Sequence, residues 1–173
     1  MKKVFISLTA VAIMITINIH VKAQASFEPG QLGITAGVSY GLDLEEPAFR
    51  AGLTYFLTQE LRAGVDFTYW FLEDVLIEQE EITNTGYEIN GNLHFLFVSS
   101  RNLVLYGAGA AGIHFASTSS DIPEFDTSDS EFAVGAGIGA ELNFGMLSFF
   151  AEPKIFFSGF DQLKLNGGLR LYL

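Results

Sequence analysis

Charged residues recur at alternate positions in stretches that are otherwise small or apolar. Buried charges persist only when they are paired and hydrogen-bonded. Such residues would therefore either line a selective or gated channel or form a polar plug that stabilises the fold. Of the two, we expect a structural plug. Counting from the intervening turns places Arg50 diagonal to Asp66 and Glu152 diagonal to Arg170. The predicted lumen charge network comprises Arg50, Arg62, Asp66, Glu88, Glu141, Glu152, Lys154, Lys164 and Arg170.

Two histidines are the other candidates for chemistry. The chain has no Cys, which excludes a disulfide scaffold, a thiol nucleophile and a Cys-ligated metal. His94 shares a face with Glu88, but we expect an interior histidine that pairs across from Tyr106 on the next strand. His114 precedes two serines by three and five residues, which resembles the nucleophile–base pairing of hydrolases, but no triad spacing accompanies them. We predict no catalytic residue, no metal ligand set and no cofactor.

Two glycine-rich runs, 107–112 and 135–139, mimic a nucleotide-binding pattern. The G-x-G-x-x-G fingerprint requires a strand before it and a helix after it, whereas both runs lie within predicted strands. We interpret them sterically, because a narrow barrel has just enough interior for side chains to fill. Inward glycines leave room for large inward side chains such as Trp70, Phe150 and Phe156.

Acidic residues outnumber basic ones by 20 to 9, for a net charge of −11. This balance argues against nucleic acid as a partner. The acids concentrate in four predicted connections that carry no Lys or Arg, namely 43–47, 73–85, 117–130 and 158–161. The densest group could hold a divalent cation weakly, although it lacks the EF-hand order, and the alternative is a set of solvated loops. This group is Asp121, Glu124, Asp126 and Asp129.

Residues 1–23 have the pattern of a signal peptide. Lys2 and Lys3 precede an apolar run, and small residues at the −3 and −1 positions predict cleavage before Gln24. A membrane anchor helix is the alternative, but the run is shorter than the roughly 20 residues needed to span a bilayer. Cleavage would remove three lysines and no acid, which brings the net charge from −11 to −14.

The remainder, 24–173, alternates with a period of two residues over eight segments. In the last segment, leucines at 163, 165, 169, 171 and 173 fall on one face, and Gln162, Lys164, Asn166 and Arg170 on the other. Alternation over segments of about ten residues is typical of membrane β-barrels. The eight segments are 31–42, 48–57, 61–72, 86–98, 102–116, 131–144, 147–157 and 162–173.

These segments predict an all-β fold, an eight-stranded antiparallel up-and-down transmembrane β-barrel. A soluble β-sandwich or lipocalin-like barrel also alternates, but it would place apolar residues inside and charges outside. Here the charges share a face with Gly, Ala and Ser, which suits a narrow interior. Short and long connections also alternate, as do the periplasmic turns and outer loops of outer-membrane barrels.

The C-terminal stretch carries a family resemblance. Asn166, Gly168, Leu171 and Leu173 fit the signal by which outer-membrane barrels are recognised for assembly, although the family most often ends in Phe. With the signal peptide and eight strands, the chain resembles small OmpA/OmpX-type outer-membrane β-barrel proteins. The resemblance implies insertion by the barrel-assembly machinery, residence in a Gram-negative outer membrane, and contact with its lipid and lipopolysaccharide. It carries no catalytic residue to this chain.

We therefore expect a non-enzymatic, monomeric outer-membrane protein that presents acidic loops on a plugged barrel. Its role would be envelope stability, adhesion or ligand contact. A small-solute pore is the alternative, and a lipid-modifying outer-membrane enzyme is a further one.

Overall fold

The fold is a closed antiparallel barrel of eight long strands with one short added strand. This computed structural model describes residues 27–72, 75–77, 80–120, 127–157 and 162–173. Within these ranges, no helix is long and apolar enough to cross a membrane. The strands are β1 (Leu32–Gly41), β2 (Glu46–Phe56), β3 (Leu61–Trp70), β4 (Val75–Ile77), β5 (Glu80–Ser99), β6 (Leu103–Ser120), β7 (Thr127–Phe144), β8 (Leu147–Phe157) and β9 (Gln162–Tyr172).

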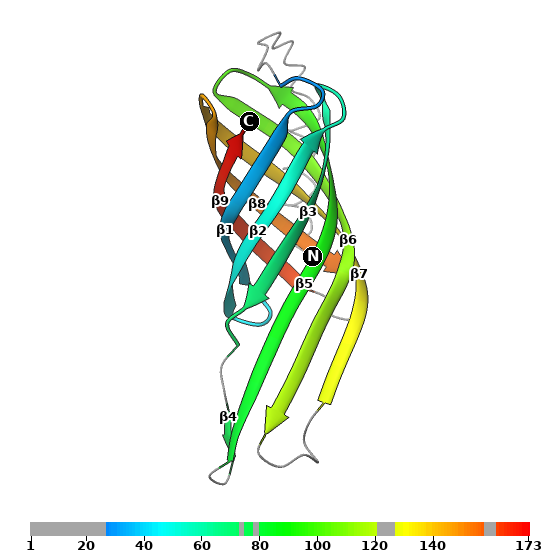
Figure 1. Cartoon of the computed structure of the whole chain (residues 1–173), viewed down its shortest axis with the longest axis vertical. Helices are drawn as coiled ribbons and strands as arrows, with labels where there is room; N and C mark the ends of the chain where they lie inside the picture. Colours follow the sequence, from blue (N-terminus) through cyan, green and yellow to red (C-terminus); the bar gives the residue numbers. More distant parts are fainter. Residues whose placement is uncertain (1–26, 73–74, 78–79, 121–126, 158–161) are drawn as a thin grey trace, which may run out of the picture.

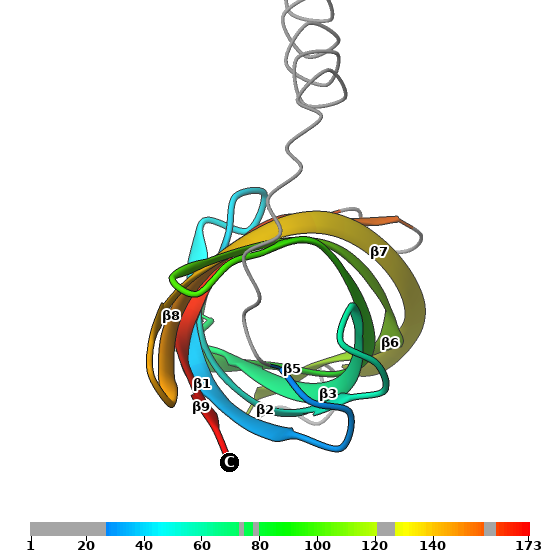
Figure 2. The same ribbon diagram turned by 90° about the horizontal axis from the view of Figure 1, so that it is seen from above.

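Hydrogen bonding joins the strands in the order β3-β2-β1-β9-β8-β7-β6-β5-β4. An additional pairing of β3 with β5 closes the ring, and β4 pairs only with β5 among the described strands. The closed ring is visible along the barrel axis in Figure 2. The predicted eight-stranded up-and-down barrel is therefore confirmed.

Burial alternates along every strand in the sense that a membrane barrel requires. On β9, Lys164 and Arg170 are buried while Leu165 and Leu169 are exposed. The large exposed hydrophobic residues come from all eight long strands, and the interior holds most of the buried polar and charged side chains. A soluble sandwich or lipocalin-like barrel would show the opposite arrangement, so that alternative is wrong.

The two ends of the barrel differ in their connections. We call the end with the connections 57–60, 100–102 and 145–146 the short-turn end, and the opposite end the long-loop end. The short-turn end is uppermost in Figure 1, together with the C-terminus. Gly145 adopts a φ of +74° in the two-residue turn between β7 and β8, a conformation that glycine tolerates without strain.

Strands β5, β6 and β7 extend beyond the barrel at the long-loop end, towards the bottom of Figure 1. They are longer than predicted, because parts of the expected connections 73–85 and 117–130 pair as strands, from Ile82 opposite Ser120 to Thr118 opposite Thr127. The sequence there is rich in Thr and Ser and lacks an apolar face. A hydrogen-bonded ladder needs no apolar face once it leaves the membrane, so the expected strand boundaries were wrong on this side.

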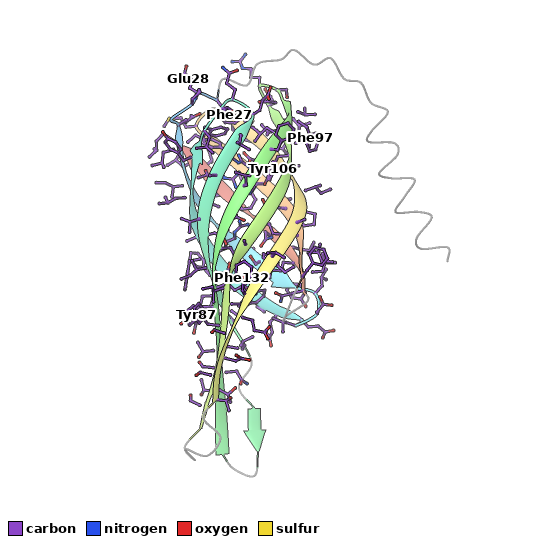
Figure 3. The ribbon with its side chains drawn as sticks, turned by 90° about the vertical axis from the view of Figure 1, so that its right-hand side faces the viewer. Phe27, Glu28, Tyr87, Phe97, Tyr106 and Phe132 are labelled. Atoms are coloured by element: carbon purple, nitrogen blue, oxygen red, sulfur yellow. The ribbon has the colours of Figure 1, made fainter. Side chains whose placement is uncertain are left out.

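Aromatic side chains mark two levels of the outer surface. Tyr87 stacks on Phe115 near the long-loop end, with ring centroids 4.6 Å apart, and Phe97 lies near the short-turn end of the same strand, β5. Figure 3 shows Tyr87 and Phe97 at these two levels. Phe97 is ten positions further along the strand than Tyr87, and in a strand tilted by about 40° this separation spans roughly 25 Å along the barrel axis. That is the height of the apolar band between the aromatic girdles of outer-membrane barrels.

Candidate functional site

The candidate site is the charged interior of the barrel. All nine residues of the predicted lumen charge network are buried, and each one makes an ion pair within the network. They occupy inward positions on β2, β3, β5, β7, β8 and β9, so the strand alternation directs them to one space. Three clusters follow one another from the short-turn end to the long-loop end.

The first cluster is centred on Glu141, whose side chain is fully buried. Its carboxylate accepts hydrogen bonds from the guanidinium groups of Arg62 and Arg170 and from the hydroxyl of Tyr172, the last at 2.7 Å. Arg62 also donates to Tyr172 at 2.6 Å, and its Cζ lies 4.5 Å from the ring centroid of Tyr106. One carboxylate thus pairs with two guanidinium groups.

The second cluster is centred on Arg50. Its guanidinium lies 3.0 Å from Asp66 and 3.2 Å from Glu152, so it joins two walls of the barrel. Glu152 also pairs with Lys154 at 3.0 Å and accepts a hydrogen bond from the Tyr106 hydroxyl at 3.0 Å. Every charge in this cluster therefore has a partner of opposite sign.

The third cluster is centred on Glu88, nearest the long-loop end. Its carboxylate accepts hydrogen bonds from Lys164 and, at 2.8 Å, from the indole N–H of Trp70. His114 lies 3.6 Å from the same carboxylate and 3.2 Å from the side-chain oxygen of Asn90.

One predicted diagonal pair forms and the other does not. Arg50 and Asp66 form an ion pair across neighbouring strands. Glu152, in contrast, lies opposite Asn166, and Arg170 lies opposite Ser148, so the two are four positions apart along the ladder. Arg170 instead reaches over the intervening strand β8 to Glu141, because Glu141 lies opposite Phe150 and Phe150 lies opposite Gly168, two positions from Arg170.

Both histidines contact buried side chains inside the barrel. His94 lies opposite Ala108, so Tyr106 is diagonal to it rather than directly across as expected. The two rings nevertheless approach to 4.8 Å, and His94 Nδ1 accepts a hydrogen bond from Arg62 at 2.9 Å. Ser117 is on the opposite side of its strand from the inward-pointing His114, which contacts Glu88 and Asn90 instead. The described residues assemble no nucleophile–base pair here.

The glycine runs lie within strands β6 and β7. A Cβ atom on Gly139 would come within 2.1 Å of the Tyr106 ring, and one on Gly135 within 2.9 Å of the Phe156 ring. These glycines therefore leave space for inward aromatic side chains.

An aromatic cluster closes the short-turn end. Phe27 stacks on Phe56 with ring centroids 4.6 Å apart and lies 4.9 Å from Tyr172. Leu96 and Val104 complete the buried cluster, and Figure 3 shows Phe27 at this end near Tyr106. This role of Phe27 could not be predicted from the sequence, because Phe27 precedes the first alternating segment and a single aromatic residue has no periodicity.

Other predicted site residues lie elsewhere. Asp121, Glu124 and Asp126 fall outside the described residues, and so does the predicted signal peptide. Asp129 is exposed and accepts a hydrogen bond from the backbone N–H of Ser130 at 2.7 Å. Among the described residues there is no group of three His, Asp or Glu side chains that could hold a metal ion.

The residues of the predicted assembly signal occupy β9 and the chain end. Asn166 is buried and donates to the backbone oxygen of Glu152 at 2.9 Å. Gly168 lies opposite Gly37, where a Cβ would come within 2.4 Å of the Ala36 carbonyl oxygen. Leu171 and Leu173 are exposed on the outer surface.

The interior differs in free space from one end to the other. Two cavities between the clusters have volumes of only about 10 Å³ each. A larger pocket of about 160 Å³ opens at the long-loop end, between the Glu88 cluster and the mouth of the barrel. We call it the rim pocket, and its lining includes Leu44, Trp70, Leu72, His114, Ala116 and Gln162.

Comparisons with known proteins agree with this architecture. Residues 9–157 match the family described as the outer membrane protein beta-barrel domain. No curated protein matches the sequence.

Three solved barrels illustrate the structural similarity. The N-terminal β-barrel domain of Pseudomonas aeruginosa OprF has a TM-score of 0.64 at 13% identity, covering 85% of this chain and 100% of that one. Ail of Yersinia pestis, in complex with the heparin analogue sucrose octasulfate, has a TM-score of 0.60 at 18% identity, covering 84% and 100%. Neisserial surface protein A has a TM-score of 0.58 at 15% identity, covering 82% and 94%.

Proposed function

Because the chain belongs to the outer membrane protein beta-barrel domain family, we propose that it is a non-enzymatic outer-membrane protein whose filled barrel supports an acidic outer surface. The short-turn end faces the periplasm and the long-loop end faces outwards, as in outer-membrane barrels with short periplasmic turns. Its role is to stabilise the envelope or to contact ligands at the cell surface.

The observation that carries this proposal is the paired and tightly filled interior. Arg50, Glu141 and Glu88 each lie at the centre of a cluster that spans the lumen, and the cavities between clusters are about 10 Å³. Such a cavity is close to the minimum that holds one water molecule. Open aqueous channels are typical of barrels with 16–18 strands rather than eight. These features favour a structural plug over a solute pore.

Conductance in planar bilayers tests the plug. We expect no steady single-channel current from the folded protein. Reproducible current steps that change when Trp70 or Phe156 is replaced by Ala would contradict the proposal, because both side chains lie in the lumen and would then border the conducting path. The same two variants also serve as the control, because current from non-specific leakage of the bilayer would be the same for the variants and the parent protein.

The distribution of charge supports the acidic outer surface. Five of the six basic residues that follow the predicted signal peptide are buried in the lumen, and the remaining one, Arg101, lies in a connection at the short-turn end. The outward connections carry acids without any Lys or Arg. Ail was solved with a polyanion, whereas the acidic connections of this chain favour cations. Divalent cations would bridge these acids to lipopolysaccharide, which is also anionic.

Calcium titration tests this contact. We expect saturable amide shifts in the connection 117–130 with a Kd of about 10⁻⁴–10⁻³ M, the range of weak extracellular sites. Changing Asp121, Glu124 and Asp126 to Asn or Gln should remove them. If the shifts do not saturate at millimolar calcium, or if the variant shows identical shifts, the cation contact is refuted and the acidic loops are simply solvated.

Export and assembly form the last part of the proposal. The predicted signal peptide is removed, the barrel-assembly machinery recognises the C-terminal strand, and the protein remains a monomer in the outer membrane. After expression of the full chain, cell fractionation should place the protein in the outer membrane. Its gel band should shift when the sample is heated in SDS, and N-terminal sequencing of the mature protein should start at Gln24. A soluble, unshifted product would refute it.

A further inference from the structure

We propose that the rim pocket binds a small neutral molecule that combines one apolar ring with one hydrogen-bond acceptor. The pocket lies at the long-loop end of the lumen, where β3, β5, β6 and β9 surround it. This inference goes beyond the structural role proposed above, because it assigns a ligand to the outer mouth of the barrel.

The size of the pocket suits a single ring. Its volume of about 160 Å³ is close to that of an engineered protein cavity of about 150 Å³ that binds benzene. Trp70, Leu72 and Leu44 provide an apolar lining against which an aromatic ring can pack. A much larger ligand would not fit within the described walls.

The carboxylate at the floor of the pocket is already paired with a cation, which favours a neutral ligand. Glu88 at the floor is held by Lys164 and by the indole N–H of Trp70. Asp43 at the rim accepts a hydrogen bond from the backbone N–H of Leu163 at 2.8 Å. A charged group that reached the floor would lose its hydration without gaining a free counter-charge.

Gln162 supplies the polar contact. Its side chain is 4% exposed, and its Nε2 atom has no hydrogen-bond partner among the described residues. Buried donors are rarely left unpaired, because an unsatisfied group costs free energy. The Nε2 atom lies beside the outer edge of the Trp70 ring, since both would crowd a Cβ on Gly41. A ligand that packs against Trp70 in this pocket would therefore have its acceptor near Gln162.

The pocket is blind rather than the entrance of a channel. The ion pair of Glu88 with Lys164 lies beneath it, and the next cavity, between Asp66 and Lys154, is about 10 Å³. A ligand can therefore enter from the outside and must leave by the same route.

Trp70 is the single tryptophan of the chain, so its indole N–H resonance reports on the pocket directly. The experiment uses the folded protein in lipid nanodiscs and titrates acetophenone, with α-methylstyrene as a probe of similar shape that lacks the acceptor oxygen. We expect a saturable shift of the Trp70 resonance with a Kd of about 1 mM for acetophenone. α-Methylstyrene should bind about 2- to 10-fold more weakly, the effect of one neutral hydrogen bond.

Matched variants locate the site. Ala116→Leu fills the pocket and should abolish the shift, whereas Ala111→Leu makes the same change on the outward face of the same strand and should preserve it. Leu72→Phe, just beyond the end of β3, is a second filling variant if Ala116→Leu does not fold. Gln162→Met should weaken acetophenone binding about 2- to 10-fold and leave α-methylstyrene unchanged.

The result that would overturn the proposal is a Trp70 resonance that does not saturate, or equal binding by Ala116→Leu and Ala111→Leu in their folded forms. Equal weakening of both probes by Gln162→Met would also overturn it, because the acceptor would then have no specific donor. Heat-dependent migration in SDS gels identifies the folded form of each variant.

Discussion

Replacing Glu141 by Gln removes the charge on which the first lumen cluster depends. Glu141 is fully buried and serves two guanidinium groups, those of Arg62 and Arg170. The substitution keeps the side-chain volume and one acceptor oxygen, so packing changes little. It leaves two buried cations without a carboxylate.

The expected loss follows from the number of cations left unpaired. Breaking a buried ion pair from one side costs about 3–5 kcal/mol, and two affected partners place Glu141→Gln near the upper limit, about 5 kcal/mol. Asp66→Asn provides the comparison, because Arg50 keeps its second partner, Glu152, at 3.2 Å. It should lose one charge-assisted hydrogen bond, about 1.5–3 kcal/mol.

Equilibrium urea unfolding in lipid vesicles, followed by Trp70 fluorescence, measures both free energies of unfolding. A double-mutant cycle with Arg170→Gln tests the pairing itself. The double variant should be less destabilised than the sum of Glu141→Gln and Arg170→Gln, by at least about 1 kcal/mol, because contacting residues are not additive.

Equal and small losses for Glu141→Gln and Asp66→Asn would refute this reasoning, since the charges would then contribute little to stability. Strict additivity in the cycle would likewise show that Arg170 and Glu141 do not stabilise each other. In either case the lumen charges would need an explanation other than a structural plug.

Two further predictions concern packing. Gly139→Ala should lower the free energy of unfolding by about 1–3 kcal/mol, because its Cβ would overlap Tyr106. Gly107→Ala on the neighbouring strand should stay within about 0.5 kcal/mol, because no atom of the described residues lies within 4 Å of its Cβ. Similar urea midpoints for the two variants would contradict this prediction. Phe27→Ala should cost about 3 kcal/mol through loss of its stacking on Phe56, and an unchanged urea midpoint would show that the segment before β1 does not stabilise the barrel.

The sequence alone was sufficient for the fold class and for the direction of each side chain. A strand has a period of two, so Leu165 and Lys164 must face opposite sides whatever the rest of the chain does. Because the lipid-facing side of a membrane barrel must be apolar, that alternation also assigned the charges to the lumen. The pairing of Arg50 with Asp66 was predictable for a local reason, since one short turn fixes the register of β2 and β3.

The closed barrel alone decided which residues meet across the lumen. Arg62 and Glu141 are separated by 79 positions and lie on strands that are not neighbours, so no turn relates them. Their approach depends on the stagger between all the intervening strands, which accumulates around the ring. The predicted pairing of Glu152 with Arg170 failed because the neighbouring strands β8 and β9 pair in a register that places Glu152 opposite Asn166. Phe27 found its place only when closure created an apolar end for it to fill. Local periodicity fixes which way a side chain points, whereas closure of the ring fixes what it touches.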